Sequence, residues 1–342
     1  ARVCDAWGGG ARNVMMTLAT GGGKGVLIAH AVTQCDGPAR VIAHRGEIVG
    51  QLSLALNREG VPHAIDAPAP VIADICSRHH EEHGRSWYRP RALTRVCSVQ
   101  TLAARGEEAA DAERVKLVVV DEAHHVVKGT VWDKAIHLYA NARCLLPTAH
   151  AIRGDHKGLG RHAHGLADTL VVGPCFRELI EDGYLCDYRP IVADGGVDFA
   201  SVPVGTAGDY NHKKLAAATM ASKHIVGDAV QHYRKFADGK MGINFCVSVE
   251  AAGELQRAYS KANVRAEIIT GETPTHVRTK LMRQFRARDI LVLLSIDVLG
   301  EGVDVPAVEF ITMSRGTASF QVFGQQTGRG SRVSVGKEWS AV

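Results

Sequence analysis

Length, composition and charge exclude several classes of protein. The chain has 342 residues, 46% of them hydrophobic and 22% charged, which excludes a disordered, collagen-like or coiled-coil protein. Forty Lys and Arg residues stand against 36 Asp and Glu residues, and the net charge of +4 permits a polyanionic partner without requiring one. This length suits one large domain or two smaller ones.

Cysteine spacing and apolar runs indicate where the protein works. Its eight cysteines form no C-x-x-C pair and no regular disulfide framework, which favours a reducing compartment. No apolar run approaches the roughly 18 residues of a membrane span, and the first residues lack a signal-peptide pattern. We therefore expect no membrane partner and a cytoplasmic location, or a nucleoid-associated one in a bacterial or phage-infected cell. Because the chain starts at Ala1 instead of Met, we expect a truncated N-terminus.

Short apolar, β-branched runs recur along the first half of the chain, with helix-capable segments between them. This alternation is typical of a parallel sheet that is buried on both faces. The predicted strands are residues 13–19, 39–44, 94–99, 115–120 and 142–147.

The second half repeats the alternation after a change in composition. A stretch rich in Pro, Gly and Asp follows Cys186, and it predicts a linker over residues 187–220. Further strands are predicted at residues 241–248, 265–270, 289–296 and 307–314. The sequence thus predicts an α/β protein with two tandem lobes, residues 1–186 and 221–342.

A glycine-rich loop follows the first predicted strand. It consists of Thr20, Gly21, Gly22, Gly23, Lys24 and Gly25, and a helix-capable segment comes next. Glycines allow backbone N–H groups to approach phosphate oxygens, the helix N-terminus adds positive potential, and a lysine can reach the outer phosphates. Taken alone, the loop could also be a turn with a solvated lysine, because Gly25 stands where a phosphate loop has a magnesium-binding Ser or Thr.

Two acids follow the fourth predicted strand. Asp121 and Glu122 come directly after the run 115–120, and ligands of open parallel sheets lie at the carboxyl ends of strands. Asp121 can hold Mg²⁺, and Glu122 can orient and deprotonate an attacking water. Either acid by itself could be a solvated strand end, but that interpretation is poor for the whole set.

These two segments resemble a known family. The letters ATGGGKG at 19–25 and VVVDEAH at 118–124 resemble motifs I and II of the superfamily 2 helicases and translocases, in the DEAH-lettered group. Further segments resemble motifs Ia, Ib, III, IV, V and VI, namely 43–45, 98–102, 148–151, 245–248, 297–306 and 325–332. The resemblance implies two RecA-like lobes with the ATP site in the cleft between them, and ATP and Mg²⁺ as cofactors.

The resemblance also assigns roles to individual residues. Arg332 would be the arginine finger, Arg329 would contact the γ-phosphate or the acids, and Gln325 would sense the nucleotide or the attacking water. Motif V would add Gly302 and Asp304 to the nucleotide site. The residues implied to couple ATP to nucleic acid are His124, Thr148 and Ala149. The residues implied on the nucleic-acid track are His44, Arg45, Gln100, Thr101, Thr270 and Gly271, although His44 and Arg45 could also be ordinary surface residues.

Three departures from the family pattern concern turnover. Gly25 removes the usual magnesium hydroxyl, residues 148–151 read Thr-Ala-His-Ala instead of Ser/Thr-Ala-Thr/Ser-Pro, and Gly316 replaces the usual proline after Arg315. Our hypothesis is that nucleotide binding is retained and hydrolysis is slowed.

A separate cluster could bind a metal. Cys76, His79, His80 and His83 share one face of a possible helix, which is compatible with zinc, but no second ligand pair with suitable spacing lies nearby. A solvated helix surface is the favoured interpretation.

Three functions follow from these patterns. The leading one is an ATP-dependent nucleic-acid helicase or translocase, with DNA favoured over RNA. The alternative is a nucleic-acid clamp with weakened ATPase activity, or a motor subunit of a larger remodelling, restriction or viral assembly. A phosphate-loop kinase or metabolic NTPase would give the arginine-rich motif at 325–332 no role.

Overall fold

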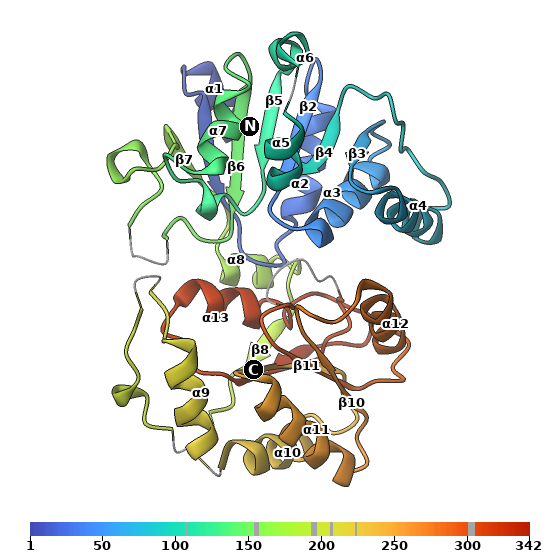
Figure 1. Cartoon of the computed structure of the whole chain (residues 1–342), viewed down its shortest axis with the longest axis vertical. Helices are drawn as coiled ribbons and strands as arrows, with labels where there is room; N and C mark the ends of the chain where they lie inside the picture. Colours follow the sequence, from blue (N-terminus) through green and yellow to red (C-terminus); the bar gives the residue numbers. More distant parts are fainter. Residues whose placement is uncertain (107, 154–156, 193–196, 206–207, 223, 300–304) are drawn as a thin grey trace. The chain divides into compact units, whose positions relative to one another are not determined.

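The computed structural model describes the chain except residues 107, 154–156, 193–196, 206–207, 223 and 300–304 (Figure 1). The chain forms two compact units, residues 1–175 and 176–342. Each unit contains its own parallel sheet, so the predicted fold class of two tandem α/β lobes is confirmed.

The described part of the first unit contains a seven-stranded sheet in the order β3-β4-β2-β5-β6-β1-β7. Neighbouring strands are parallel throughout. The strands are β1 Asn13–Thr17, β2 Ala39–Ala43, β3 Ala64–Asp66, β4 Arg95–Ser98, β5 Leu117–Val120, β6 Arg143–Thr148 and β7 Thr169–Val172. All five strands predicted in this unit are confirmed, and the short edge strands β3 and β7 are additional.

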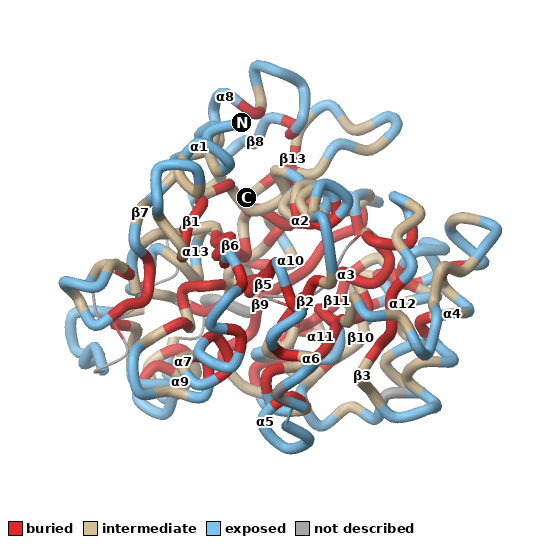
Figure 2. Tube along the Cα trace, turned by 90° about the horizontal axis from the view of Figure 1, so that it is seen from above, coloured by how far each residue is buried: buried red, intermediate tan, exposed pale blue. Residues whose placement is uncertain are grey.

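Helices cover this sheet. They are α1 Arg2–Gly8, α2 Lys24–Thr33, α3 Gly46–Arg58, α4 Ala69–His83, α5 Val99–Arg105, α6 Ala109–Arg114 and α7 Val131–His137. One apolar cluster joins α5 and α7 to alternate residues of the central strands, including Ile42, Val118 and Leu146. Helices α2, α3 and α4 pack on one another, and α3 contacts β2. The central strands are therefore buried along nearly their whole length (Figure 2).

The second unit has a six-stranded parallel sheet among its described residues, in the order β10-β11-β9-β12-β13-β8. Its strands are β8 Asp187–Arg189, β9 Gly242–Cys246, β10 Ala266–Ile269, β11 Val292–Ser295, β12 Phe310–Ser314 and β13 Trp339–Ala341. Its helices are α8 Phe176–Glu181, α9 His212–Ala221, α10 His224–Phe236, α11 Val249–Lys261, α12 Thr275–Arg286 and α13 Phe320–Thr327. The four strands predicted in this half are confirmed.

The structure differs from the predicted boundary between the lobes. Residues 176–186 belong to the second unit, where the Cys186 amide donates to the Ser331 carbonyl over 2.7 Å. Within the segment expected to be a linker, β8 pairs in parallel with β13. Local composition does not encode a pairing partner about 150 residues away, here β13. The Pro- and Gly-rich composition therefore predicted a loop in place of a strand.

A buried polar network connects α3 to α4 and to the loop after α4. The Ser53 hydroxyl lies 2.7 Å from His63 Nε2 and 3.1 Å from His79 Nε2, and His79 Nδ1 lies 3.0 Å from the Ser86 hydroxyl. Ser53 and both imidazoles are fully buried. His79 therefore faces the interior, and the favoured interpretation of a solvated cluster was wrong for this residue. Among the described residues, no three potential metal ligands converge, so the zinc interpretation has no support.

This network makes the first unit sensitive to acid. Burial, followed by the positive charge of His63, lowers the pKa of His79 to about 4, and burial also lowers the pKa of His63. Between pH 6.5 and 4 the unfolded chain binds more protons than the folded one, so stability falls as the pH falls. We expect the free energy of unfolding to drop by about 1.4 kcal/mol per pH unit for His79 below pH 6.5. Urea titrations at pH 7 and pH 5 measure this drop, and a His79→Gln variant with an equally steep pH dependence would contradict the assignment.

Candidate active site

The motif residues of the first unit lie at one edge of its sheet. Strands β4, β2, β5, β6 and β1 are consecutive neighbours and run parallel, so their carboxyl ends share an edge. The Asp121 amide donates to the Ile42 carbonyl over 3.0 Å, and the Leu18 amide donates to the Thr148 carbonyl over 3.0 Å. Motifs I, Ia, Ib, II and III thus follow adjacent strands, as expected for a ligand site of a parallel sheet.

The glycine loop bends into α2 through two left-handed residues. Gly21 and Gly23 have φ values of 83° and 88°, a region that favours glycine over residues with a side chain. Gly23 is the N-cap of α2, and no side chain of the described chain caps this helix. The first N–H groups of a helix have no partner within the helix, so this terminus can accept an anion. The Thr20 hydroxyl is buried and has no hydrogen-bond partner among the described residues.

Lys24 and Glu122 meet at the mouth of this loop. Lys24 Nζ lies 2.8 Å from Glu122 Oε1, and the two side chains are 13% and 12% exposed. Glu122 has a left-handed φ of 51°, and its amide donates to the Asp121 carboxylate over 2.9 Å. The structure therefore brings together three of the residues that the sequence analysis assigned to nucleotide chemistry.

The two neighbouring acids differ in their electrostatic surroundings. Burial raises the pKa of Asp121, and the adjacent Glu122 charge raises it further. Burial also disfavours ionised Glu122, but the Lys24 ammonium and the hydrogen bond from His124 outweigh it and lower the Glu122 pKa. Glu122 thus stays ionised, as a base must, whereas ionised Asp121 would be favoured by a nearby cation.

The residues expected to couple ATP to nucleic acid are joined to this acid pair. His124 Nδ1 lies 3.4 Å from Glu122 Oε2 and 3.3 Å from the Thr148 hydroxyl. That hydroxyl donates to the His150 carbonyl over 2.9 Å. Ala149, between Thr148 and His150 in the sequence, is half-buried, and only its backbone can form hydrogen bonds. A side-chain path thus leads from motif II to motif III.

His125 is a residue to which the sequence analysis gave no role. Its ring lies 4.9 Å from the His44 ring and 4.1 Å from the His124 ring, measured between centroids. Trp132 stacks on its other side at 6.3 Å with an interplanar angle of 11°. His125 therefore connects motif Ia to motif II, and only the His-His doublet in the sequence could have indicated it.

The other residues assigned to nucleic acid in this unit lie close by along the same edge. Arg45 and Gln100 are exposed. The Thr101 amide donates to the Ser98 hydroxyl over 3.0 Å, so Thr101 takes part in capping α5. Because Ala43 and Ser98 are register partners in β2 and β4, motifs Ia and Ib begin side by side.

The second unit has its own motif edge. The carboxyl ends of β10, β11, β9 and β12 are aligned by register, so motifs IV and V and the loop at Thr270 follow neighbouring strands. Arg278 donates to the Thr270 carbonyl over 3.2 Å and to the Gly271 carbonyl over 3.4 Å, which fixes this exposed loop. Gly302 and Asp304 lie outside the described residues.

Arg315 anchors the start of motif V. Its buried guanidinium lies 2.7 Å from an Asp297 carboxylate oxygen and 3.1 Å from one of Asp209. At the next position, a Cβ on Gly316 would lie 2.1 Å from the Phe199 ring. The ring thus occupies the space that a larger residue would need, which gives a physical reason for glycine at this position.

Motif VI begins on α13 and continues past it. Gln325 and Arg329 are buried, with exposed fractions of 6% and 7%, and Arg332 is half-buried. Both arginines belong to the second unit, whereas Lys24 and Glu122 belong to the first.

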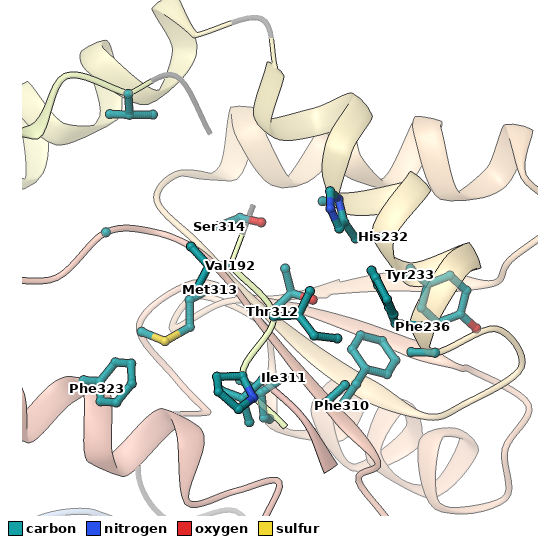
Figure 3. A pocket seen from close by; sticks show the side chains of 18 of the residues that line it. Val192, His232, Tyr233, Phe236, Phe310, Ile311, Thr312, Met313, Ser314 and Phe323 are labelled. Carbon is teal, nitrogen blue, oxygen red and sulfur yellow. The ribbon is translucent and has the colours of Figure 1, made fainter. Parts of the chain in front are cut away.

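A cavity of about 590 Å³ lies elsewhere in the second unit, between α10, β12 and the chain segment after β8 (Figure 3). Aromatic and aliphatic side chains line it, among them Tyr233, Phe236, Phe310 and Phe323. No Lys or Arg is among the lining residues that the structure describes, and these therefore lack the charged donors that a triphosphate needs.

Two family models match the chain, one on each unit. Residues 1–152 match the res subunit of type III restriction enzymes, and residues 225–334 match the helicase conserved C-terminal domain. The chain belongs to the superfamily 2 helicases and translocases. The more specific DEAH-lettered group stays a prediction.

Several known proteins are similar over nearly the whole chain. A 51.5 kDa protein of a Lactococcus phage is 26% identical over 93% of this chain and 62% of its own length. The Saccharomyces cerevisiae protein named "Putative ATP-dependent helicase IRC3" is 24% identical over 96% of this chain and 48% of its own length. The solved structure of the ATP-dependent type ISP restriction-modification enzyme LlaBIII bound to DNA shares the fold, with a TM-score of 0.63 and 14% identity, over 99% of this chain and 26% of that one.

The chain spans about half to three-fifths of the length of these two curated relatives. Among the described residues, no helix combines the length and apolar character needed to cross a bilayer.

Proposed function

We propose that this chain is the motor core of an ATP-dependent nucleic-acid helicase or translocase that acts on DNA in preference to RNA. The observation that carries the proposal is the Lys24–Glu122 ion pair beside Asp121 at the glycine loop. A lysine, an ionised carboxylate and an uncapped helix N-terminus are the groups that nucleoside triphosphate hydrolysis requires. The helicase C-terminal model on the second unit and the restriction-enzyme res-subunit model on the first support the same activity.

The residues at this edge fit ATP and Mg²⁺. The left-handed glycines leave the helix N-terminus accessible, and a Cβ at Gly23 would meet nothing within 4 Å, so the loop has room for a phosphate chain. Asp121 would hold the cation, which supplies charge neutralisation on the phosphates when bound. Lys24 would bind the outer phosphates, and Glu122 would orient a water and accept its proton.

The role of the second unit is part of the proposal. Arg329 and Arg332 would stabilise the negative charge that develops on the transferred phosphoryl group, and Gln325 would sense the nucleotide. Gly302 and Asp304 would contribute to the same site. Nucleotide-dependent closure of the two units would then produce movement along the strand held by the track residues of motifs Ia and Ib and the Thr270 loop.

The preference for DNA and the cellular location rest on less direct support. The match to the res subunit of a restriction enzyme favours DNA and membership of a larger complex. All eight cysteines are free thiols, which favours the cytoplasm or the nucleoid over an oxidising compartment.

A second candidate is a nucleic-acid clamp with weakened turnover, which the missing hydroxyl at Gly25 favours. One experiment separates the two: ATP turnover of the chain measured side by side with single-stranded DNA, duplex DNA and RNA. The motor predicts stimulation by DNA, and the clamp predicts DNA binding with negligible turnover. Substantial turnover that is equal without nucleic acid and with each of the three would contradict both.

A further inference from the structure

The backbone that carries the motif VI arginines leaves regular structure after α13. The segment from Gly328 to Arg332 belongs to no helix or strand, although its carbonyl groups are almost all bound. The Ser331 hydroxyl donates to the Gly328 carbonyl over 3.0 Å, and the Cys186 amide donates to the Ser331 carbonyl over 2.7 Å. Of the three remaining carbonyls of this turn, those of Gly330 and Arg332 accept from one further side chain.

Lys337 binds both of these carbonyls and one more. Its ammonium donates to the Arg332 carbonyl over 2.7 Å, to the Pro306 carbonyl over 3.3 Å and to the Gly330 carbonyl. An ammonium has three N–H donors, so all three are used. Pro306 ends motif V, and the other two acceptors belong to motif VI. A single side chain outside the motifs thus ties the two together.

The surroundings hold Lys337 in this position. Gly336 has a left-handed φ of 78°, and the Lys337 amide donates to the Ser334 carbonyl over 3.1 Å, so a tight turn brings the lysine back over motif VI. A Cβ on Gly330 would lie 2.5 Å from the Ser340 hydroxyl, so the turn packs closely on β13. Burial lowers the pKa of Lys337, and its ammonium also interacts with the Cys186 thiol beside the three carbonyls.

We propose that Lys337 is a positioning residue for ATP hydrolysis, which fixes the backbone of Arg329 and Arg332 against the end of motif V. The proposal rests on the proposed function. The three N–H bonds of an ammonium point apart in tetrahedral directions, so one ammonium can donate to three carbonyls that surround it. A guanidinium donates only in its own plane, so arginine is a poor substitute. A catalytic guanidinium displaced by about 1 Å can cost ~100-fold in rate, so the turn needs such a clamp.

The first test compares Lys337→Met with Lys261→Met, a control at the exposed end of α11. Methionine keeps the length of the stem and removes all three donors. We expect kcat for DNA-stimulated ATP turnover to fall by ~10- to 100-fold in Lys337→Met, with KM for ATP changed by less than about threefold. Lys261→Met should match the parent chain. An unchanged kcat in folded Lys337→Met overturns the proposal.

A double variant distinguishes positioning from a general loss of stability. If Lys337 acts through motif VI, adding Lys337→Met to Arg332→Ala should lower kcat little further, because the clamped group is already gone. If the fold-loss of kcat in the double variant equals the product of the fold-losses in the two single variants, the two residues act independently and the proposal is overturned. If Lys337→Met does not fold, Lys337→Gln replaces it in both tests, since its amide can still donate to two carbonyls.

Hydrogen exchange provides a readout that does not depend on turnover. Loss of the clamp should speed exchange of the Cys186 and Gly330 amides, which donate to the Ser331 and Thr327 carbonyls, and leave the β9 amides unchanged. If the parent chain hydrolyses no ATP with any nucleic acid, the proposed function fails. Exchange then decides the positioning role: local acceleration supports it, and unchanged exchange overturns it.

Discussion

Replacing Glu122 with glutamine should lower ATP turnover by about 100- to 10,000-fold, because glutamine keeps the shape of the side chain but cannot accept a proton. The Lys24 ammonium and the hydrogen bond from His124 lower the pKa of Glu122 and so favour its ionised form. Nucleotide binding should persist, since Lys24 and the glycine loop are unchanged. Steady-state turnover and binding of a fluorescent ATP analogue measure the two effects separately.

Two controls make the Glu122 result specific. Glu59→Gln makes the same chemical change at an exposed residue after α3 and should leave turnover unaltered. Lys24→Ala should weaken nucleotide binding itself, because it removes the only side-chain cation that the structure places on the glycine loop among the described residues. Turnover of Glu122→Gln within about tenfold of the parent would refute the assignment of the base.

Restoring a hydroxyl at Gly25 should accelerate Mg²⁺-dependent turnover. Gly25 is the second residue of α2, and a Cβ there would meet only the Ala55 methyl at 3.7 Å, an ordinary contact. The Cβ of a threonine therefore fits without displacing its neighbours. Mutation of residues that only hydrogen-bond to a metal's ligands typically lowers metal affinity or activity by ~10- to 100-fold. A direct hydroxyl ligand should have at least a comparable effect, so we expect Gly25→Thr to raise kcat at least about tenfold at limiting Mg²⁺.

Gly25→Ala is the matched control for this gain. Alanine and threonine both add a Cβ and favour the helix over glycine, but only threonine adds an oxygen that can bind magnesium. Turnover measured over a range of Mg²⁺ concentrations should rise for Gly25→Thr and stay at the parent level for Gly25→Ala. If turnover rises equally in both variants, the cause is the greater stability of the helix. If turnover rises in neither variant, the missing hydroxyl at Gly25 is not the cause of slow hydrolysis.

Strands with long apolar runs were predictable, and short or exposed ones were not. Residues 117–120 are continuously apolar because β5 is covered on both faces, and that pattern is visible in the letters. β3 has only three residues, and β7 alternates between half-buried and exposed positions at the sheet edge. β8 depends on pairing with β13, which local sequence does not encode.

In the candidate site, too, some contacts were predictable from the sequence and others were not. Lys24 and Glu122 are 98 residues apart, yet the rule that parallel strands share a carboxyl edge was enough to place them together. His79 was different, because its burial depends on Ser53 and Ser86 reaching it from other elements. The contacts of Lys337 with three carbonyls likewise require the folded path of the chain. Roles that rest on the motifs, such as those of Gln100 and Arg332, stay predictions.

The Phe199 ring over Gly316 restricts how this sequence can evolve. A larger residue at position 316 requires the ring to move, and a smaller residue at position 199 would leave Gly316 uncovered. The fitness effect of a change at one position must therefore depend on the residue at the other, as for residues in direct contact generally. A proline at position 316 would then require either a substitution of Phe199 or a displacement of its ring.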